Sequence, residues 1–151
     1  MKWEFTTEVV DQIIYAMENQ EQSFLLDFAT GSIVASEEAP ATREEDRWHD
    51  LPVWRSNEGF QLMERFVAGL RNPMVRDELR MALASGKGVF RQFKNTLKSR
   101  PEVERVWHRF KEREMRKVVY DWFNQILELR GLARLDLPAD EATDELILSD
   151  F

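Results

Sequence analysis

The chain has 151 residues, of which 43% are hydrophobic and 32% charged, and its formal net charge is −7. This length fits one domain with a sizeable core, and the composition is typical of a globular rather than a disordered protein. The sequence has no cysteine, which excludes disulfides, thiolate zinc sites and cysteine nucleophiles.

The first residues, Met1 to Glu8, lack the apolar stretch of a signal peptide and carry acids where such a peptide would be basic. No apolar run approaches the roughly 20 residues that a membrane span needs. We therefore expect a cytoplasmic protein with no membrane partner.

The first third of the chain is predicted to combine one helix with a β-hairpin. Apolar residues recur at helical spacing over residues 7–19, and Thr6 or Thr7 can cap this helix. Residues 23–35 are typical of two strands joined by a turn in which Gly31 supplies a positive φ. Two strands alone are marginally stable, so the hairpin must pack on helices or pair with another strand.

The next segment is a polar link followed by helices. We expect residues 36–50 to form a surface loop with a helical turn, and residues 51–54 to be extended because of Pro52. The second helix is predicted to begin at Ser56. Asn72 and Pro73 form a favoured start for the third helix. The third helix is predicted to extend to Ser85 and Gly86, with the apolar residues Val75, Leu79, Met81, Ala82 and Leu83.

Two more helices are predicted from the same spacing. The fourth covers residues 89–99, with an apolar face made of Phe90, Phe93 and Leu97. Residues 99–102 match a capping box that opens the fifth helix, which we expect to reach Arg130 with Gly131 as its stop. The apolar residues of the fifth helix form two groups about 100° apart, at 103–110 and 115–129. The helix therefore either bends between them or turns its apolar face to a different neighbour.

These elements predict an α+β fold that is mostly helical, with four to five helices and a small N-terminal β-hairpin. We expect a single globular domain over residues 1–131. Residues 132–151 are predicted to be an acidic, loosely held C-terminal tail that folds back weakly on the basic middle of the chain.

Charge is unevenly distributed along the sequence. Residues 1–50 hold 3 bases and 12 acids, residues 51–100 hold 10 bases and 4 acids, and residues 131–151 hold 1 base and 6 acids. The basic middle can act on its own despite the acidic total, because salt screens charges over about 10 Å. The alternative is that the acidic ends neutralise the middle within the fold.

The segment from Ser85 to Lys94 is the most informative in the chain. Two glycines flank a lysine ahead of a helix, and the N–H groups of a helix start can bind an anion. Three bases of that helix lie within about 60° of arc. The predicted anion-binding residues are Gly86, Lys87, Gly88, Arg91, Lys94 and Lys98. The alternative is an ordinary helix junction whose bases form a solvated face.

Other polar clusters are weaker candidates. A second basic stripe, interleaved with acids, is predicted to be a solvated, salt-bridged face: Arg105, Arg109, Arg113 and Arg116. A metal site would require a helical link at 36–50, with ligands from Glu45, Asp46, His49 and Asp50, and we predict neither a metal nor a cofactor. No nucleophile has a recognisable base near it, so no catalytic residue is predicted.

Several segments resemble a known family. They are Leu51–Pro52, Met63–Phe66 and Gly86–Lys94, continued by Pro101, Trp107, Phe110 and Trp122. These segments are similar to a bacterial family catalogued as uncharacterised protein family number one hundred and fifty-eight. The resemblance covers roughly residues 7–125, and the glycine–lysine–glycine segment is its most specific part. That family carries no known activity, so the resemblance implies the extent of the domain and adds no mechanism.

We therefore predict a non-enzymatic binding or regulatory domain that contacts an anionic partner, RNA or an acidic protein, through its basic face. One alternative is a protein–protein interaction domain that uses an apolar groove or the hairpin edge. Another is an unrecognised small-molecule enzyme. Nucleic-acid affinity that falls steeply with salt would favour the first prediction, and salt-insensitive self-association the second.

Overall fold

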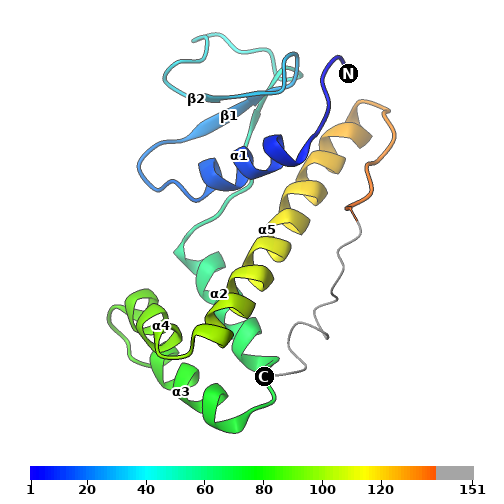
Figure 1. Cartoon of the computed structure of the whole chain (residues 1–151). Helices are drawn as coiled ribbons and strands as arrows, with labels where there is room; N and C mark the ends of the chain where they lie inside the picture. Colours follow the sequence, from blue (N-terminus) through cyan, green and yellow to red (C-terminus); the bar gives the residue numbers. More distant parts are fainter. Residues whose placement is uncertain (139–151) are drawn as a thin grey trace. The chain divides into compact units, whose positions relative to one another are not determined.

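The computed structural model describes residues 1–138, in which five helices accompany one three-stranded antiparallel sheet (Figure 1). The predicted α+β, mostly helical fold is confirmed. The described residues divide into two compact units: unit 1 comprises residues 1–55 and 115–137, and unit 2 comprises residues 56–114 and residue 138. The predicted contacts of the acidic tail beyond residue 138 lie outside the described residues.

Unit 1 begins with α1 (Thr7–Met17), which starts as predicted and ends two residues earlier. The Thr6 hydroxyl accepts a hydrogen bond from the Val9 N–H, so this threonine caps the helix. The buried face of α1 consists of Val10, Ile13, Ala16 and Met17. This face packs against Met115, Val119 and Tyr120 of the last helix.

The sheet of unit 1 has the strand order β2-β1-β3. The predicted hairpin is confirmed as β1 (Phe24–Asp27) and β2 (Ser32–Ala35). Its turn requires Gly31, because φ is +78° there and a Cβ would lie 2.5 Å from the Trp3 ring. β3 (Trp48–Asp50) lies within the segment predicted to be a loop, so that prediction is wrong for these residues. Pairing with β1 supplies the third strand that the hairpin needs.

The last helix, α5 (Pro101–Leu129), contributes residues to both units. The helix is continuous over these residues, and its two predicted apolar groups fall in different units. Gly131, with φ +69°, ends the helix as predicted. The Gly131 N–H donates to the Glu128 carbonyl (3.0 Å) and the Leu132 N–H to that of Leu127 (2.9 Å), which is a Schellman motif.

Order continues past the predicted domain boundary at residue 131. The Asn124 side chain donates to the Leu135 carbonyl (2.9 Å) and accepts from the Leu135 N–H (2.7 Å). Leu135 also packs against the apolar core of unit 1. The first residues of the predicted tail are therefore attached to α5. Whether residues 1–131 behave as a single domain stays a prediction.

Unit 2 contains α2 (Ser56–Ala68), α3 (Pro73–Leu83), α4 (Val89–Lys98) and the first half of α5, shown in green to yellow in Figure 1. The Asn72 side chain caps α3 and Pro73 is its first residue, as predicted. The core is aromatic: the Trp107 ring lies 5.2 Å from that of Phe66 and 5.0 Å from that of Phe93, edge to face in both cases.

Two predictions about single residues are wrong. Phe90, expected on the buried apolar face of α4, is 44% exposed. Met81 (74%) and Leu129 (90%) are also exposed, although each fits the apolar spacing of its helix. Ser99 does not open α5; it ends α4, and its hydroxyl donates to the Thr96 carbonyl (2.6 Å). Conversely, Phe123 does not fit the predicted second apolar group of the fifth helix, which consists of Met115, Val118, Val119, Trp122, Ile126 and Leu129. It is fully buried, and its ring stacks on that of Phe5 at 4.0 Å.

Candidate functional site

The turn before α4 has the conformation that its glycines allow. Gly86 has φ +80°, and Gly88 has φ +60° and ψ +36°, so both lie in the left-handed region. Gly88 occupies the N-cap position and has no side chain with which to cap the helix. The first turn of α4 also contains no acidic residue. The exposed N–H groups at this end are therefore left to water or to a ligand.

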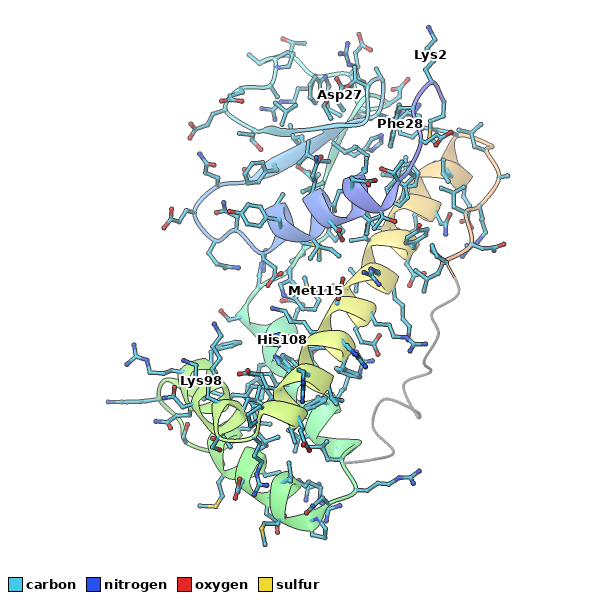
Figure 2. All side chains as sticks on the ribbon, in the orientation of Figure 1. Lys2, Asp27, Phe28, Lys98, His108 and Met115 are labelled. Atoms are coloured by element: carbon cyan, nitrogen blue, oxygen red, sulfur yellow. The ribbon has the colours of Figure 1, made fainter. Side chains whose placement is uncertain are left out.

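We define the basic face by the side chains of Lys87, Arg91, Lys94 and Lys98. All four residues are exposed, and Lys98 is labelled in Figure 2. Phe93 and Leu97 form the buried face of the same helix. Within residues 1–138, no side chain of the basic face forms a hydrogen bond or an ion pair. Helical spacing puts Arg91, Lys94 and Lys98 on one side of α4, and among residues 1–138 their charges have no partner.

The acids of unit 2 that approach arginines are already engaged. Both oxygens of Glu78 accept hydrogen bonds from Arg100 at 2.8 Å, and this contact lowers the pKa of Glu78. The buried Glu114 carboxylate accepts a bond of 2.7 Å from Arg65. Between Glu78 and Glu102, the sequence contains six bases and no acid. The basic face lies within this stretch.

The charge asymmetry seen along the sequence follows the two structural units. Residues 56–114 carry 13 lysines and arginines against 8 acids, whereas unit 1 carries 8 against 15. The prediction that the acidic ends neutralise the middle requires contacts to the basic face, and the described residues provide none to its four side chains. Residues 56–114 are therefore a cationic stretch within an acidic chain.

A second polar cluster, in unit 1, was not predicted from the sequence. Asp27, labelled in Figure 2, is buried at the end of β1 and accepts two hydrogen bonds from Arg47, at 2.9 and 3.0 Å. It also accepts bonds from the Ala29 N–H and the Thr30 hydroxyl. The hydrogen bonds from Arg47 are the main cause of the lowered pKa of Asp27. This arrangement fixes the hairpin turn.

The proposed metal ligands around His49 do not form a site. The link is not helical there, and His49 lies on β3. Its Nε2 atom is 3.3 Å from the backbone carbonyl oxygen of Asp46 rather than from a carboxylate. Within residues 1–138, no three metal-ligating side chains come together. Burial lowers the pKa of His49.

Arg130 is the partner of His49 that local sequence signals could not reveal. Its Nη2 atom lies 3.3 Å from Nε2 of His49, and its guanidinium carbon lies 3.6 Å from the centre of the Phe28 ring. Such a cation–π contact holds an arginine in place. His49 and Phe28 lie 81 or more positions before Arg130 in the sequence.

The second basic stripe is only partly the solvated face that was predicted. Arg105 and Arg109 are exposed, whereas Arg113 and Arg116 are half-buried and have partners.

Comparison with known proteins yields a family but no activity. The model of "Uncharacterised protein family (UPF0158)" matches residues 6–145. A protein of Pseudomonas aeruginosa named "UPF0158 protein PA5073" is 26% identical over 121 residues, which cover 75% of this chain and 78% of that protein. No solved structure matches the chain. Among residues 1–138, no helix has the length and apolar character to cross a membrane. The match over nearly the whole sequence shows that this chain belongs to the UPF0158 family.

Proposed function

We propose that this protein is a non-enzymatic binding domain whose basic face contacts an anionic partner, with RNA as the favoured partner. The observation that carries this proposal is that Arg91, Lys94 and Lys98 on one side of α4, and Lys87 in the turn before it, are exposed without an ion-pair partner among the described residues. Bases that stabilise a fold are usually matched by acids one helical turn away, and α4 contains no acid.

The favourable free energy of binding would come from phosphates that contact the basic face. Each phosphate neutralised by a lysine or arginine releases condensed counterions, so the affinity depends steeply on salt. The uncapped N-terminus of α4 adds a positive partial charge at the Gly88 end of the basic face. Gly86 and Gly88 would contribute by forming the turn that leaves this end of α4 without a side-chain cap. The cytoplasmic location expected from the sequence stays a prediction.

The test is a binding titration with a fluorescently labelled RNA at several salt concentrations. Replacing Lys87, Arg91 and Lys94 together with alanine should weaken binding and reduce the salt slope by about one for each lost phosphate contact. The matched control replaces three other exposed arginines of unit 2, Arg71, Arg105 and Arg109, and should retain most of the affinity. Equal binding by the parent and the α4 variant would contradict the proposal. Binding of polyglutamate in place of RNA would identify an acidic protein as the partner.

A second candidate function has one specific observation in its favour. Met74 and Met81 lie two turns apart on α3 with 67% and 74% of their surface exposed. Met81 borders a depression of about 510 Å³ between α3 and α4. Exposed methionines beside a groove suit an apolar protein contact. Sedimentation at low and high salt tests this candidate: salt-insensitive self-association that is lost on replacing both methionines with glutamine would favour it.

A further inference from the structure

Phe90 is placed differently from the other aromatic residues of unit 2. Its ring is 44% exposed, whereas Phe66, Phe93, Trp107 and Phe110 are buried. One edge of this exposed ring lies close to α2. A Cβ built on Gly59 of α2 would lie 3.3 Å from Cε1 and 3.7 Å from Cζ of Phe90, so one edge of the ring rests directly on a helix position without a side chain.

The same ring adjoins the basic face. Phe90 and Lys94 are one turn apart on α4, about 40° around the helix axis, and Arg91 follows Phe90 directly. Lys87 lies in the turn that precedes α4, four residues before Arg91 in the sequence. An exposed aromatic ring, close to α2 at one edge, therefore lies beside exposed bases that have no partner within residues 1–138.

This combination distinguishes between anionic partners. Proteins that bind single-stranded nucleic acids pair lysines and arginines with phosphates and stack bases on aromatic rings. A duplex offers phosphates, sugars and the edges of its bases but keeps the base faces stacked inside, and an acidic protein offers carboxylates. Neither of these partners needs a solvent-facing ring next to the bases.

Building on the proposed function, we infer that the anionic partner is a single-stranded nucleic acid, one base of which stacks on Phe90 while Lys87, Arg91, Lys94 and Lys98 contact the backbone. RNA and single-stranded DNA share this chemistry. The ring gives affinity without base selectivity, because every base has a π-face.

The experiment measures the anisotropy of labelled 12-nucleotide strands, oligouridylate and oligothymidylate, against the full chain. A duplex RNA and inorganic polyphosphate serve as base-stacked and base-free polyanions. We expect the single strands to bind more tightly than both at equal salt. We expect Phe90→Leu to weaken single-strand binding about tenfold and to leave polyphosphate binding unchanged. Phe90→Trp should bind as the parent does.

Tyr15→Leu is the matched control, since Tyr15 is an exposed aromatic residue on α1 of unit 1. This substitution should change neither the affinity for single strands nor the affinity for polyphosphate. The inference is supported if either single strand binds the parent and Phe90→Leu weakens that binding. The strand with the higher affinity then shows whether the partner is RNA or single-stranded DNA. If Phe90→Leu binds as the parent does while the α4 alanine variant loses affinity, this inference fails and the proposed function stands. If neither variant loses affinity, both fail. Should Phe90→Leu not fold, equal affinity of the parent for single strands, duplex and polyphosphate would overturn the inference by itself.

Discussion

The Nη2 atom of Arg130 and the backbone carbonyl oxygen of Asp46 both lie 3.3 Å from the same nitrogen, Nε2 of His49. The guanidinium needs an acceptor, whereas the carbonyl oxygen needs a donor, and one imidazole nitrogen cannot be both at once. The neutral ring with its proton on Nδ1 accepts from Arg130. A protonated ring presents Nε2–H to Asp46 and repels the guanidinium. The contact with Arg130 therefore requires neutral His49.

We expect stability to fall as the pH drops below about 6.5, the ordinary pKa of histidine. Burial is the largest effect on the pKa of His49 and lowers it. Of the charged groups that face the ring, Arg130 favours its neutral form, whereas Asp46 and Asp50 favour its charged form. A folded-state pKa below the unfolded one means that the unfolded chain binds more protons, so the free energy of unfolding rises with pH across this window. Urea denaturation between pH 5 and 7.5 measures it.

Substituting each of the two histidines separately tests this prediction, with His108→Gln as the matched control. His49→Gln should flatten the dependence on pH, whereas His108→Gln, at an exposed position of α5, should retain it. A slope that survives in His49→Gln would show that other groups cause it.

Asp27 is expected to stabilise unit 1 through its hydrogen bonds. In Asp27→Asn one acceptor oxygen remains in place of two, so the bonds from Arg47, Ala29 and Thr30 cannot all form. We expect the free energy of unfolding to fall by about 1–3 kcal/mol. Asp11→Asn, at an exposed position of α1, should change it by less than about 0.5 kcal/mol.

The lowered pKa of Asp27 gives this prediction a dependence on pH. The contribution is present above about pH 3.9, the unfolded value, and is lost as the pH falls further. The difference between the parent and Asp27→Asn should therefore shrink in acid. A constant difference from pH 7 to pH 2.5 would contradict the assignment.

Phe93→Ala should destabilise the protein strongly. The ring is 1% exposed and packs edge to face on Trp107, so its removal leaves a cavity in the core of unit 2. We expect a loss of about 3–5 kcal/mol in the free energy of unfolding. Phe90→Ala on the same helix should cost clearly less, because that ring is partly exposed already. Similar losses for the two variants in urea denaturation would show that their burial differs from the structure.

The two units are expected to unfold in one transition. α5 supplies buried side chains to both, Trp107 and Phe110 to unit 2 and Met115 and Phe123 to unit 1. Loss of either core removes the packing that stabilises part of this helix. Of the five tryptophans, Trp107 alone lies in unit 2. The tryptophan fluorescence of the parent should therefore change in a single step with urea, and two separated steps, one of which is missing in Trp107→Phe, would show two domains.

Local signals in the sequence predicted the features that depend on a few neighbouring residues. The caps at Thr6 and Asn72, the turn at Gly31 and the stop at Gly131 need only the conformational preferences of those residues. The basic face likewise follows from the spacing within one helix. The capping box at Ser99 fits the same kind of local pattern and is wrong, because Ser99 is the C-cap of α4 and its hydroxyl donates to the Thr96 carbonyl.

The features that depend on distant partners could not be predicted in this way. β3 is a strand because β1, some twenty residues earlier, has an open edge. Phe90 is exposed because it meets Gly59 of another helix rather than a cavity in the core. Apolar spacing cannot separate Phe90 from Phe93, because both lie on the same side of α4. The contact of Arg130 with His49 spans 81 residues and leaves no local pattern.

Unit 1 is discontinuous along the chain, with residues 56–114 inserted between its two parts. This order has a consequence for synthesis on the ribosome, where the chain emerges from its N-terminus. The sheet and α1 are made first, but Val119 and Phe123, which bury their apolar faces, emerge only after all of unit 2. Unit 2 can therefore complete its core while the sheet still waits for α5. Newly made chains should expose the apolar residues of α1 and β1 longest, and these residues are where a chaperone would bind.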